Sequence, residues 1–289
     1  MTQEPRRDRL PWDDDMTLCI AAASLEKGEP RIVVAFDFRV ETDWIGADAA
    51  FKMSRFTDKW AVLFAGKVAN AREVINAYAT SLSGTELTDA NIYDELRHPA
   101  QSHKLMLCEH HVQMKLGMSY AEFVEGGKEC LSESMFQETE TEIKNLNMGC
   151  DLIACGFMPS DERTDHLNTS RIFTIEECGE VSQHDNFATV GSGGVIAESV
   201  FFQRTLTRFA PLERTMYVVY EAMKLATKAP GVGGTVNMAV LEPSATGESI
   251  VYRVVSDKGY QHQQDLFKLY APKPLDVLPE VDGEWFDKR

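Results

Sequence analysis

The stretch TLCIAAA, residues 17–23, opens an apolar run that predicts the first strand of the fold over residues 17–24. A turn signal, KGEP at 27–30, separates it from a second run, RIVVAFD at 31–37. The second run is rich in β-branched residues and apolar nearly throughout, which is typical of a strand buried on both faces. A third run, WAVLFA at 60–65, is closed by Gly66. The chain therefore begins with a set of buried strands.

Helices and strands then alternate in blocks. Apolar residues recur on one helical face between Ala69 and Leu82, and the long segment 88–147 contains no convincing strand. Within that segment SYAE at 119–122 fits a capping box that opens a helix. Further strands are predicted at 151–157, 171–175, 187–191, 235–241 and 250–255, and further helices at 195–209 and 212–228. Because the helices come in consecutive pairs, the order favours two antiparallel sheets with helical layers outside them over a doubly wound parallel sheet.

The two ends of the chain differ from its centre. Residues 1–16 are charged and include DDD at 13–15, so we expect a disordered extension or a removed propeptide. Residues 17–260 form the predicted domain, and the Pro- and acid-rich residues 261–289 are expected to be a loosely ordered tail.

Composition excludes several classes of function. The chain has 289 residues and a net charge of -16, which argues against nucleic acid and anionic membranes as partners. It has no apolar run long enough to cross a membrane, and residues 1–9 lack the apolar core of a secretory signal. Six cysteines without a C-x-x-C pair indicate reduced, buried thiols in a cytoplasmic protein. The only histidine cluster, His110-His111, lies in a predicted helix and suits its surface, and nothing in the sequence calls for a metal or an organic cofactor.

Thr17 follows Met16, a residue that could start translation. A threonine at a true N-terminus carries a hydroxyl that can attack a carbonyl and an α-amine, with a pKa of about 7.7–8.0, that can act as the base. A threonine inside a chain has no such amine. Removal of residues 1–16 therefore decides between an enzyme and a protein of the same shape without chemistry.

The order of elements, together with five short motifs, resembles the proteasome β-subunit family of N-terminal-nucleophile hydrolases over residues 17–255. It is also similar to the peptidase subunit of the bacterial two-component ATP-dependent protease. The motifs are Thr17 itself, VAFDFR at 34–39, FKM at 51–53, LFAGKVANA at 63–71 and FATVGSGG at 187–194. The resemblance implies a four-layer αββα sandwich.

The resemblance also implies a role for each of five residues. Thr17 is the nucleophile, Lys52 lies near its amine and hydroxyl, Asp37 orients Lys52, the Gly66 N–H helps to form the oxyanion hole, and Ser192 relays protons. The residues by themselves allow simpler interpretations. Thr17 is a good strand former, Lys52 could be a solvated surface lysine, Gly66 suits a strand-to-helix turn and Ser192 suits a helix N-cap before Val195. Asp37 could be a turn aspartate, but at the end of an apolar strand it needs a partner such as Lys52 or backbone N–H groups.

The chain departs from the family pattern in one segment, TKAPGVGGTVNM at 227–238. The Asp and the Ser that the family carries there fall on Ala229 and Val232, so the polar groups that support Ser192 and the amine are absent. The residue before the nucleophile is Met16, where self-processing relatives have Gly.

From the resemblance we expect a proteasome-like threonine peptidase that hydrolyses amide bonds of peptides or unfolded proteins. A homo-oligomeric ring is expected with it, and an ATP-dependent unfoldase is a further candidate partner. Two alternatives stay open: a non-catalytic structural subunit of the same type, and an amidase acting on a small amide.

Overall fold

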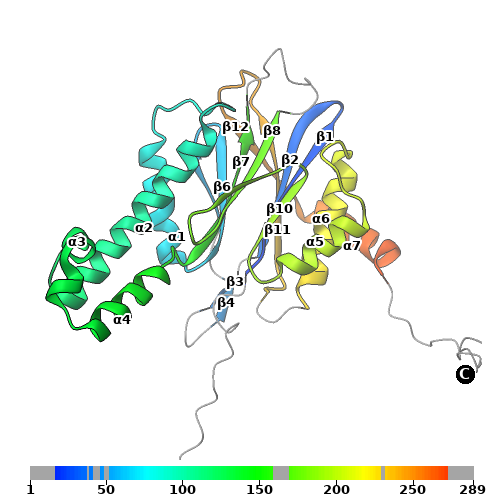
Figure 1. Ribbon diagram of the computed structural model, residues 1–289. Coiled ribbons are helices and arrows are strands. Elements are labelled where there is room, and N and C mark those ends of the chain that lie inside the picture. Colours follow the sequence, from blue (N-terminus) through cyan, green and yellow to red (C-terminus); the bar gives the residue numbers. More distant parts are fainter. Residues whose placement is uncertain are drawn as a thin grey trace, which may run out of the picture.

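The computed structural model describes residues 17–37, 39–41, 46–48, 52–158, 169–228 and 232–272. Two five-stranded antiparallel sheets lie face to face at the centre of the molecule, with helices outside both (Figure 1). The first sheet has the order β10-β1-β2-β11-β12, with β1 Cys19–Glu26, β2 Glu29–Asp37, β10 Phe187–Val190, β11 Val236–Pro243 and β12 Ile250–Val254. The second has the order β5-β6-β7-β8-β9, with β5 Met53–Thr57, β6 Trp60–Gly66, β7 Cys150–Phe157, β8 Ser170–Ile175 and β9 Val181–His184. A short hairpin pairs β3 Arg39–Glu41 with β4 Gly46–Asp48.

Each central strand divides its side chains between two cores, as the period of two requires. One core fills the space between the sheets, and its members from β1 and β6 have mostly small side chains: Cys19, Ala21, Ala23, Ala61, Leu63 and Ala65. The alternate residues of the same strands face helices, and so does Leu18 directly before β1: Ile20, Ala22, Trp60, Val62 and Phe64. Small residues on the inner faces allow the sheets to pack closely, while the larger ones fill the gaps to the helices.

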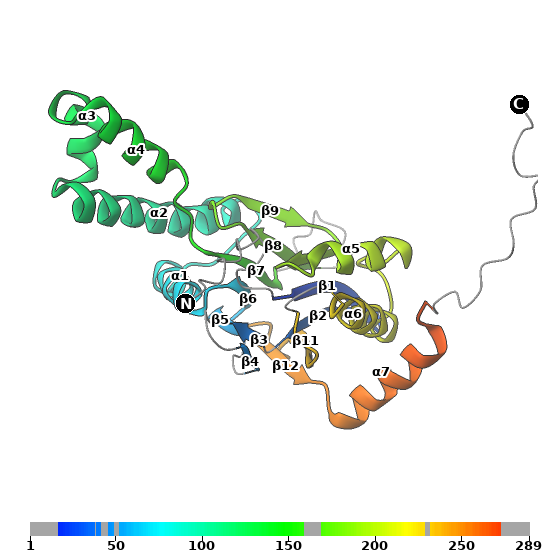
Figure 2. The same ribbon diagram turned by 90° about the horizontal axis from the view of Figure 1, so that it is seen from below.

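The helices form the two outer layers. Helices α1 (Val68–Ser81) and α2 (Ile92–Leu116) cover the second sheet, and α5 (Gly194–Gln203) and α6 (Leu212–Ala226) cover the first (Figure 2). Helix α7 (Asp257–Tyr270) packs on α6, where the ring of Phe267 meets that of Tyr220 edge to face. This is the αββα sandwich expected from the sequence.

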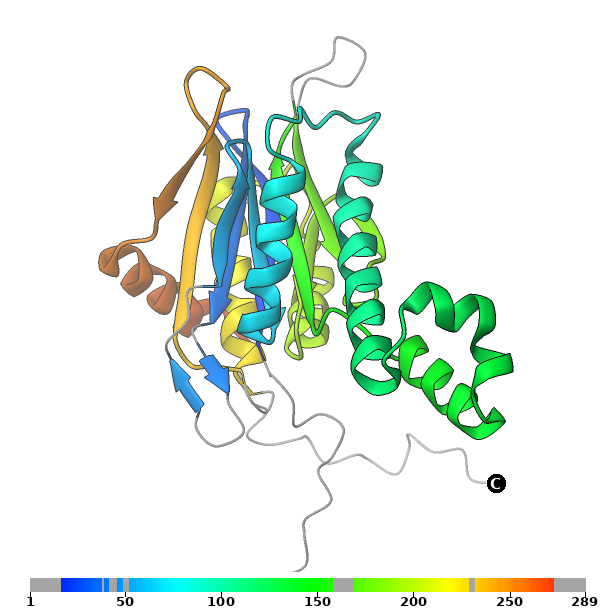
Figure 3. The ribbon, with the colours of Figure 1, turned by 90° about the vertical axis from the view of Figure 1, so that its left-hand side faces the viewer.

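The segment 88–147 forms a helical arm. Helix α2 runs past the sheet, and α3 (Tyr120–Cys130) and α4 (Glu133–Lys144) fold back against its far end (Figure 3). The arm has a small core of its own, built on Cys108, Val112, Phe123 and Ile143. The predicted capping box is present, since the Ser119 hydroxyl accepts from the Glu122 N–H at 3.2 Å and the Glu122 carboxylate accepts from the Ser119 N–H at 2.8 Å.

Several expectations are corrected. Helix α5 ends at Gln203 rather than 209, because Thr205 has a left-handed backbone with φ 47°. Helix α7 occupies 257–270, so the prediction of a loosely ordered tail is wrong over 261–270. Strands β5 and β9 were not predicted.

The cysteines are free, but Cys130 and Cys178 are exposed, whereas buried thiols were expected. His111 lies on the arm within 3.0 Å of a Glu142 carboxylate oxygen. None of the helices in the described ranges is long and apolar enough to cross a membrane. Residues 1–16 and 273–289 lie outside the described residues.

Candidate active site

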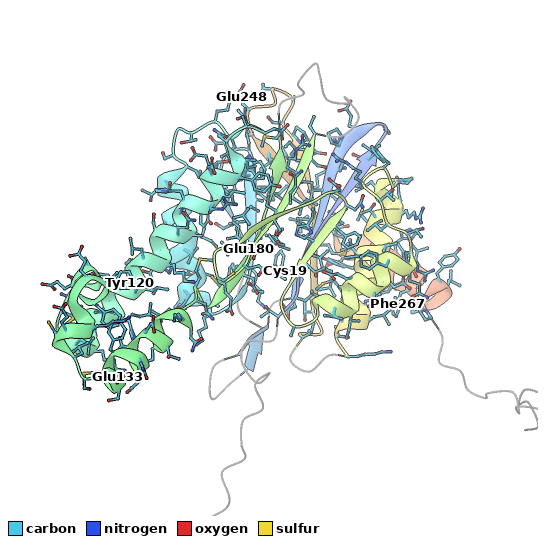
Figure 4. The ribbon with its side chains drawn as sticks, viewed as in Figure 1. Cys19, Tyr120, Glu133, Glu180, Glu248 and Phe267 are labelled. Carbon is cyan, nitrogen blue, oxygen red and sulfur yellow. The ribbon has the colours of Figure 1, made fainter. Side chains whose placement is uncertain are left out.

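Thr17 lies immediately before β1, beside the carboxyl end of β2. The Leu18 N–H donates to Asp37 Oδ1 at 3.4 Å, and the Asp37 N–H donates to the Leu18 carbonyl at 3.2 Å. Leu18 faces the helices, so by strand alternation Thr17 falls on the face between the sheets, as Cys19 does. Figure 4 labels Cys19 between the two sheets, close to the end of β1 where the chain enters.

Asp37 and Lys52 form a buried ion pair. Lys52 Nζ donates to Asp37 Oδ1 at 2.6 Å, and the two side chains are 1% and 0% exposed. The second oxygen, Asp37 Oδ2, accepts from the Gly233 N–H at 2.9 Å. The Lys52 carbonyl accepts from the Phe64 N–H at 3.2 Å, which ties the backbone before β5 to β6. The expectation that Asp37 needs Lys52 or backbone N–H groups is confirmed, and the alternative of a solvated surface lysine at 52 is wrong.

The hydroxyl of Thr17 is enclosed by the fold. Thr17 is 4% exposed, and its Oγ1 is buried without a hydrogen bond to any described residue. Gly191, with φ 96°, lies directly against it: a Cβ on Gly191 would stand 3.1 Å from Thr17 Oγ1 and would overlap the Thr17 carbonyl oxygen. Only glycine permits this approach. A buried hydroxyl without a partner costs about 1–3 kcal/mol, so the position is unfavourable for stability alone.

A cleft of about 430 Å³ opens beside Gly191, at the ends of β6, β7, β8 and β10. Gly66 and Ser192, both predicted site residues, line it. Gly66 has φ 110°, and a Cβ there would stand 2.6 Å from the Gly149 carbonyl oxygen, so the glycine is required for the turn into α1. Ser192 is exposed and does not cap α5, whose N-cap residue is Gly193, so the N-cap interpretation of Ser192 is wrong.

Two carboxylates that the sequence analysis missed line the same cleft. Asp151 is the second residue of β7 and pairs with Ala65 of β6, and its Oδ1 accepts from the Glu177 N–H at 2.8 Å. Burial raises the pKa of Asp151, opposed by that hydrogen bond, and burial together with the nearby Asp151 charge raises the pKa of Glu177. The only signal in the sequence concerned Asp151, a carboxylate at the start of the otherwise apolar predicted strand 151–157.

Cys19, the closest thiol in sequence to Thr17, is not a rival nucleophile. Its Sγ donates to the Phe64 carbonyl at 3.1 Å, and burial raises the pKa of the thiol to about 12. A thiol in this environment stays protonated at neutral pH and is a poor nucleophile.

Val232 occupies the position where the resemblance led us to expect a serine. It is 4% exposed and belongs to the core beneath α5 and α6. A Cβ on Gly193 would stand 3.0 Å from Val232 Cγ2, so an apolar side chain closes this side of the site. Ala229 lies outside the described residues.

The structure thus joins Asp37 to Lys52 by an ion pair and to the backbone next to Thr17, and it places Gly66 and Ser192 along one cleft that borders Thr17 through Gly191. Outside this cluster, the described residues include one exposed group whose ligand atoms lie within 4.8 Å of one another: Glu176, Cys178 and Glu180. Exposed acidic groups commonly lie this close together without binding an ion. No protein-family model matches the chain, and no curated protein matches its sequence.

Proposed function

We propose that this protein is an N-terminal threonine hydrolase that cleaves amide bonds in peptides once residues 1–16 have been removed. The observation that carries the proposal has two parts: Thr17 Oγ1 is buried without a hydrogen bond to any described residue, and Asp37 of the buried Asp37–Lys52 ion pair accepts the N–H of the next residue, Leu18. The five motifs that resemble the proteasome β-subunit family point to the same residue.

Stability alone does not account for this arrangement. A buried ion pair must offset the desolvation of two charges, and replacing such a pair with apolar residues is often neutral or stabilising. Here Asp37 of the pair binds the backbone N–H of Leu18, the residue after Thr17, whose own hydroxyl is buried without a hydrogen bond to any described residue. Unfavourable polar groups that gather at one place are typical of sites kept for chemistry.

The proposed reaction starts from the freed α-amine of Thr17. The amine takes the proton of the Thr17 hydroxyl while Oγ1 bonds to the scissile carbonyl carbon. The Lys52 ammonium shares the Asp37 oxygen with the Leu18 N–H, so its charge lies close to the Thr17 backbone and disfavours protonation of the amine beforehand. The Gly66 N–H is the candidate donor to the oxyanion. Collapse of the tetrahedral intermediate expels the amine half of the peptide, which takes the proton back from the Thr17 α-ammonium. Water then hydrolyses the ester on Oγ1, which releases the acid half and restores the hydroxyl.

Val232 favours a second candidate, a non-catalytic structural subunit of the same architecture. Its side chain is apolar and packed into the core, so it supplies no hydrogen bond to a proton relay through Ser192. Such a protein would keep residues 1–16, and its Thr17 would have no free amine.

Intact-mass analysis of protein from its native host decides whether Thr17 becomes the first residue. The same preparation is then treated with a peptide electrophile that reacts with a hydroxyl and an adjacent free amine, and assayed against a mixed peptide library and against small amides. Thr17→Ala is the test variant and Thr17→Ser is its matched control, because serine keeps the hydroxyl and the amine.

We expect a mature N-terminus at Thr17, one label per chain, and peptide cleavage that Thr17→Ala abolishes and Thr17→Ser retains in part. An intact 16–17 bond with no labelling would refute the proposal in favour of the structural subunit. Turnover of small amides without any peptide cleavage would favour the amidase.

A further inference from the structure

The Gly66 N–H points away from β7, toward the side of β6 on which β5 lies. The Lys67 N–H donates to the Gly149 carbonyl at 3.0 Å, so the odd-numbered amides at this end of β6 face β7. The Phe64 N–H donates in the opposite direction, to the Lys52 carbonyl at 3.2 Å. Because successive amides of a strand alternate in direction, the Gly66 N–H is directed as the Phe64 N–H is, two residues past the start of β5. The ladder with β7 therefore does not use this donor.

The Gly66 donor lies toward the rim at which Thr17 is found. Cys19 Sγ donates to the Phe64 carbonyl at 3.1 Å, which fixes the point where β1 passes over β6. Thr17 is two residues before Cys19 on its strand, and Gly66 is two residues after that point on β6. Gly191, which lies against Thr17, lines one cleft together with Gly66, so the two strand ends meet at the same rim.

The loop 147–149, which leads into β7, fixes the backbone around this donor. Gly66 has φ 110°, and a Cβ on it would stand 2.6 Å from the Gly149 carbonyl oxygen and 2.8 Å from the Cys150 Cα. The same Gly149 carbonyl accepts the Lys67 N–H, so the loop is bonded to the residue that follows Gly66. The two segments pack backbone against backbone. A shift of the loop therefore moves the peptide group that carries the Gly66 N–H.

Asn70, in the first turn of α1, holds the loop in place. Its Nδ2 donates to the Met148 carbonyl at 3.1 Å. Gly149, with φ 66°, permits this approach, because a Cβ there would stand 2.5 Å from Asn70 Nδ2. On the other side of the loop the Met148 N–H donates to the Glu177 carbonyl at 2.8 Å. The Asn70 amide thus joins the helix to the loop by a side-chain bond, next to the backbone bond from Lys67.

We propose that Asn70 is a positioning residue for the hydrolase: by holding the loop 147–149 against α1, it keeps the Gly66 N–H directed at the forming oxyanion. The inference rests on the proposed function and adds to it a residue that does not touch the substrate. An oxyanion donor contributes most when it is preorganised, because it then needs no reorientation as charge develops. The position calls for a donor, since the partner of Asn70 is a carbonyl oxygen.

The test compares Asn70→Asp with Asn76→Asp in the processed protein. Aspartate keeps the shape of asparagine, but at neutral pH it has no donor for the Met148 carbonyl. Asn76 is exposed on the same helix, so the control adds the same charge away from the loop. One peptide that the wild type cleaves is assayed for kcat and KM, with rates normalised to the chains that the peptide electrophile labels. The aldehyde of the same peptide, which adds Thr17 Oγ1 as a hemiacetal, is assayed as an inhibitor.

Asn70→Asp is expected to lower kcat by about 10- to 100-fold, because displacing a positioned group by about 1 Å can cost the larger factor. KM should change by less than about 2-fold, since the Gly66 N–H acts on the transition state rather than on the bound substrate. The Ki of the aldehyde should rise as kcat falls, because the hemiacetal resembles the tetrahedral intermediate. Asn76→Asp should leave all three values unchanged.

Asn147→Ala decides the matter if Asn70→Asp does not fold. Asn147 is exposed, and its Oδ1 accepts from the Gly149 N–H at 3.1 Å, so its removal loosens the same loop from the solvent side and should also lower kcat. An unchanged kcat in the folded variants, or a change confined to KM, would overturn this inference and leave the proposed hydrolase standing. No cleavage of any peptide by the wild type, together with no electrophile labelling, would overturn both.

Discussion

Replacing Lys52 with methionine tests the buried ion pair on which the site is built. Methionine is close to lysine in length and removes only the charge and the donor. Lys52 is 1% exposed, and its ammonium supplies the shortest hydrogen bond to Asp37, at 2.6 Å. In Lys52→Met the Asp37 carboxylate stays buried with two backbone donors, the Leu18 N–H at 3.4 Å and the Gly233 N–H at 2.9 Å.

The loss of stability follows from that geometry. Removing one partner of a buried ion pair leaves an uncompensated charge and costs about 3–5 kcal/mol. That is a large part of the roughly 5–15 kcal/mol by which most domains are stable. Adding Asp37→Asn to Lys52→Met removes the stranded charge, so the double variant is expected to be more stable than Lys52→Met alone.

Urea unfolding measures both effects through the midpoint and slope. Lys59→Met is the matched control, because Lys59 makes a 3.9 Å ion pair with Glu86 in which the side chains are 31% and 68% exposed. Exposed pairs contribute at most about 1 kcal/mol, so Lys59→Met should change little. If Lys52→Met lost no more than Lys59→Met, Asp37 would have to be solvated, and the reasoning that links this pair to function would fail.

Two further predictions concern the cleft. Gly191→Ala should lower the thermal midpoint and any peptide cleavage, because the new Cβ would overlap the Thr17 carbonyl oxygen on a backbone with φ 96°. The control is Gly126→Ala, in helix α3 with open space around it, which should instead stabilise by about 0.5–1 kcal/mol. Equal midpoints for the two variants would contradict the close approach of Gly191 to Thr17. Asp151→Asn should change the pH dependence of stability. The pKa of this carboxyl is higher in the folded state than in the unfolded state, so the carboxyl lowers the stability of the fold as pH rises from the unfolded pKa through the folded pKa. The variant lacks this group and should therefore be more stable relative to wild type at pH 7 than at pH 3. Parallel pH profiles of stability for the two proteins would count against this prediction.

The architecture was predictable because its signals are local. The apolar runs 17–24 and 60–65, and the helical face between Ala69 and Leu82, each depend on neighbouring residues, and the strands and helix occur there. The pairing of Asp37 with Lys52 was predictable for another reason: a carboxylate at the end of a buried strand needs a donor.

The remainder depends on distant parts of the chain. Asp151 and Glu177 meet only through strand register and a turn, which no local pattern records. Helix α7 was missed because its residues are mostly polar and bury little; Gln263 is its one buried residue. The end of α5 is set by a left-handed threonine, a conformation that the residue type does not favour.

The helical arm has a consequence for how the molecule opens. Its core, Cys108, Val112, Phe123 and Ile143, is separate from the three cores that hold the sandwich together. Small clusters of this size unfold locally at a lower free energy than a central sheet. The arm and the sandwich should therefore behave as separate cooperative units. Backbone amide hydrogens beyond the middle of α2 should exchange with solvent while those of the strands remain protected. Sequence change can then accumulate in the arm without disturbing the frame around Thr17.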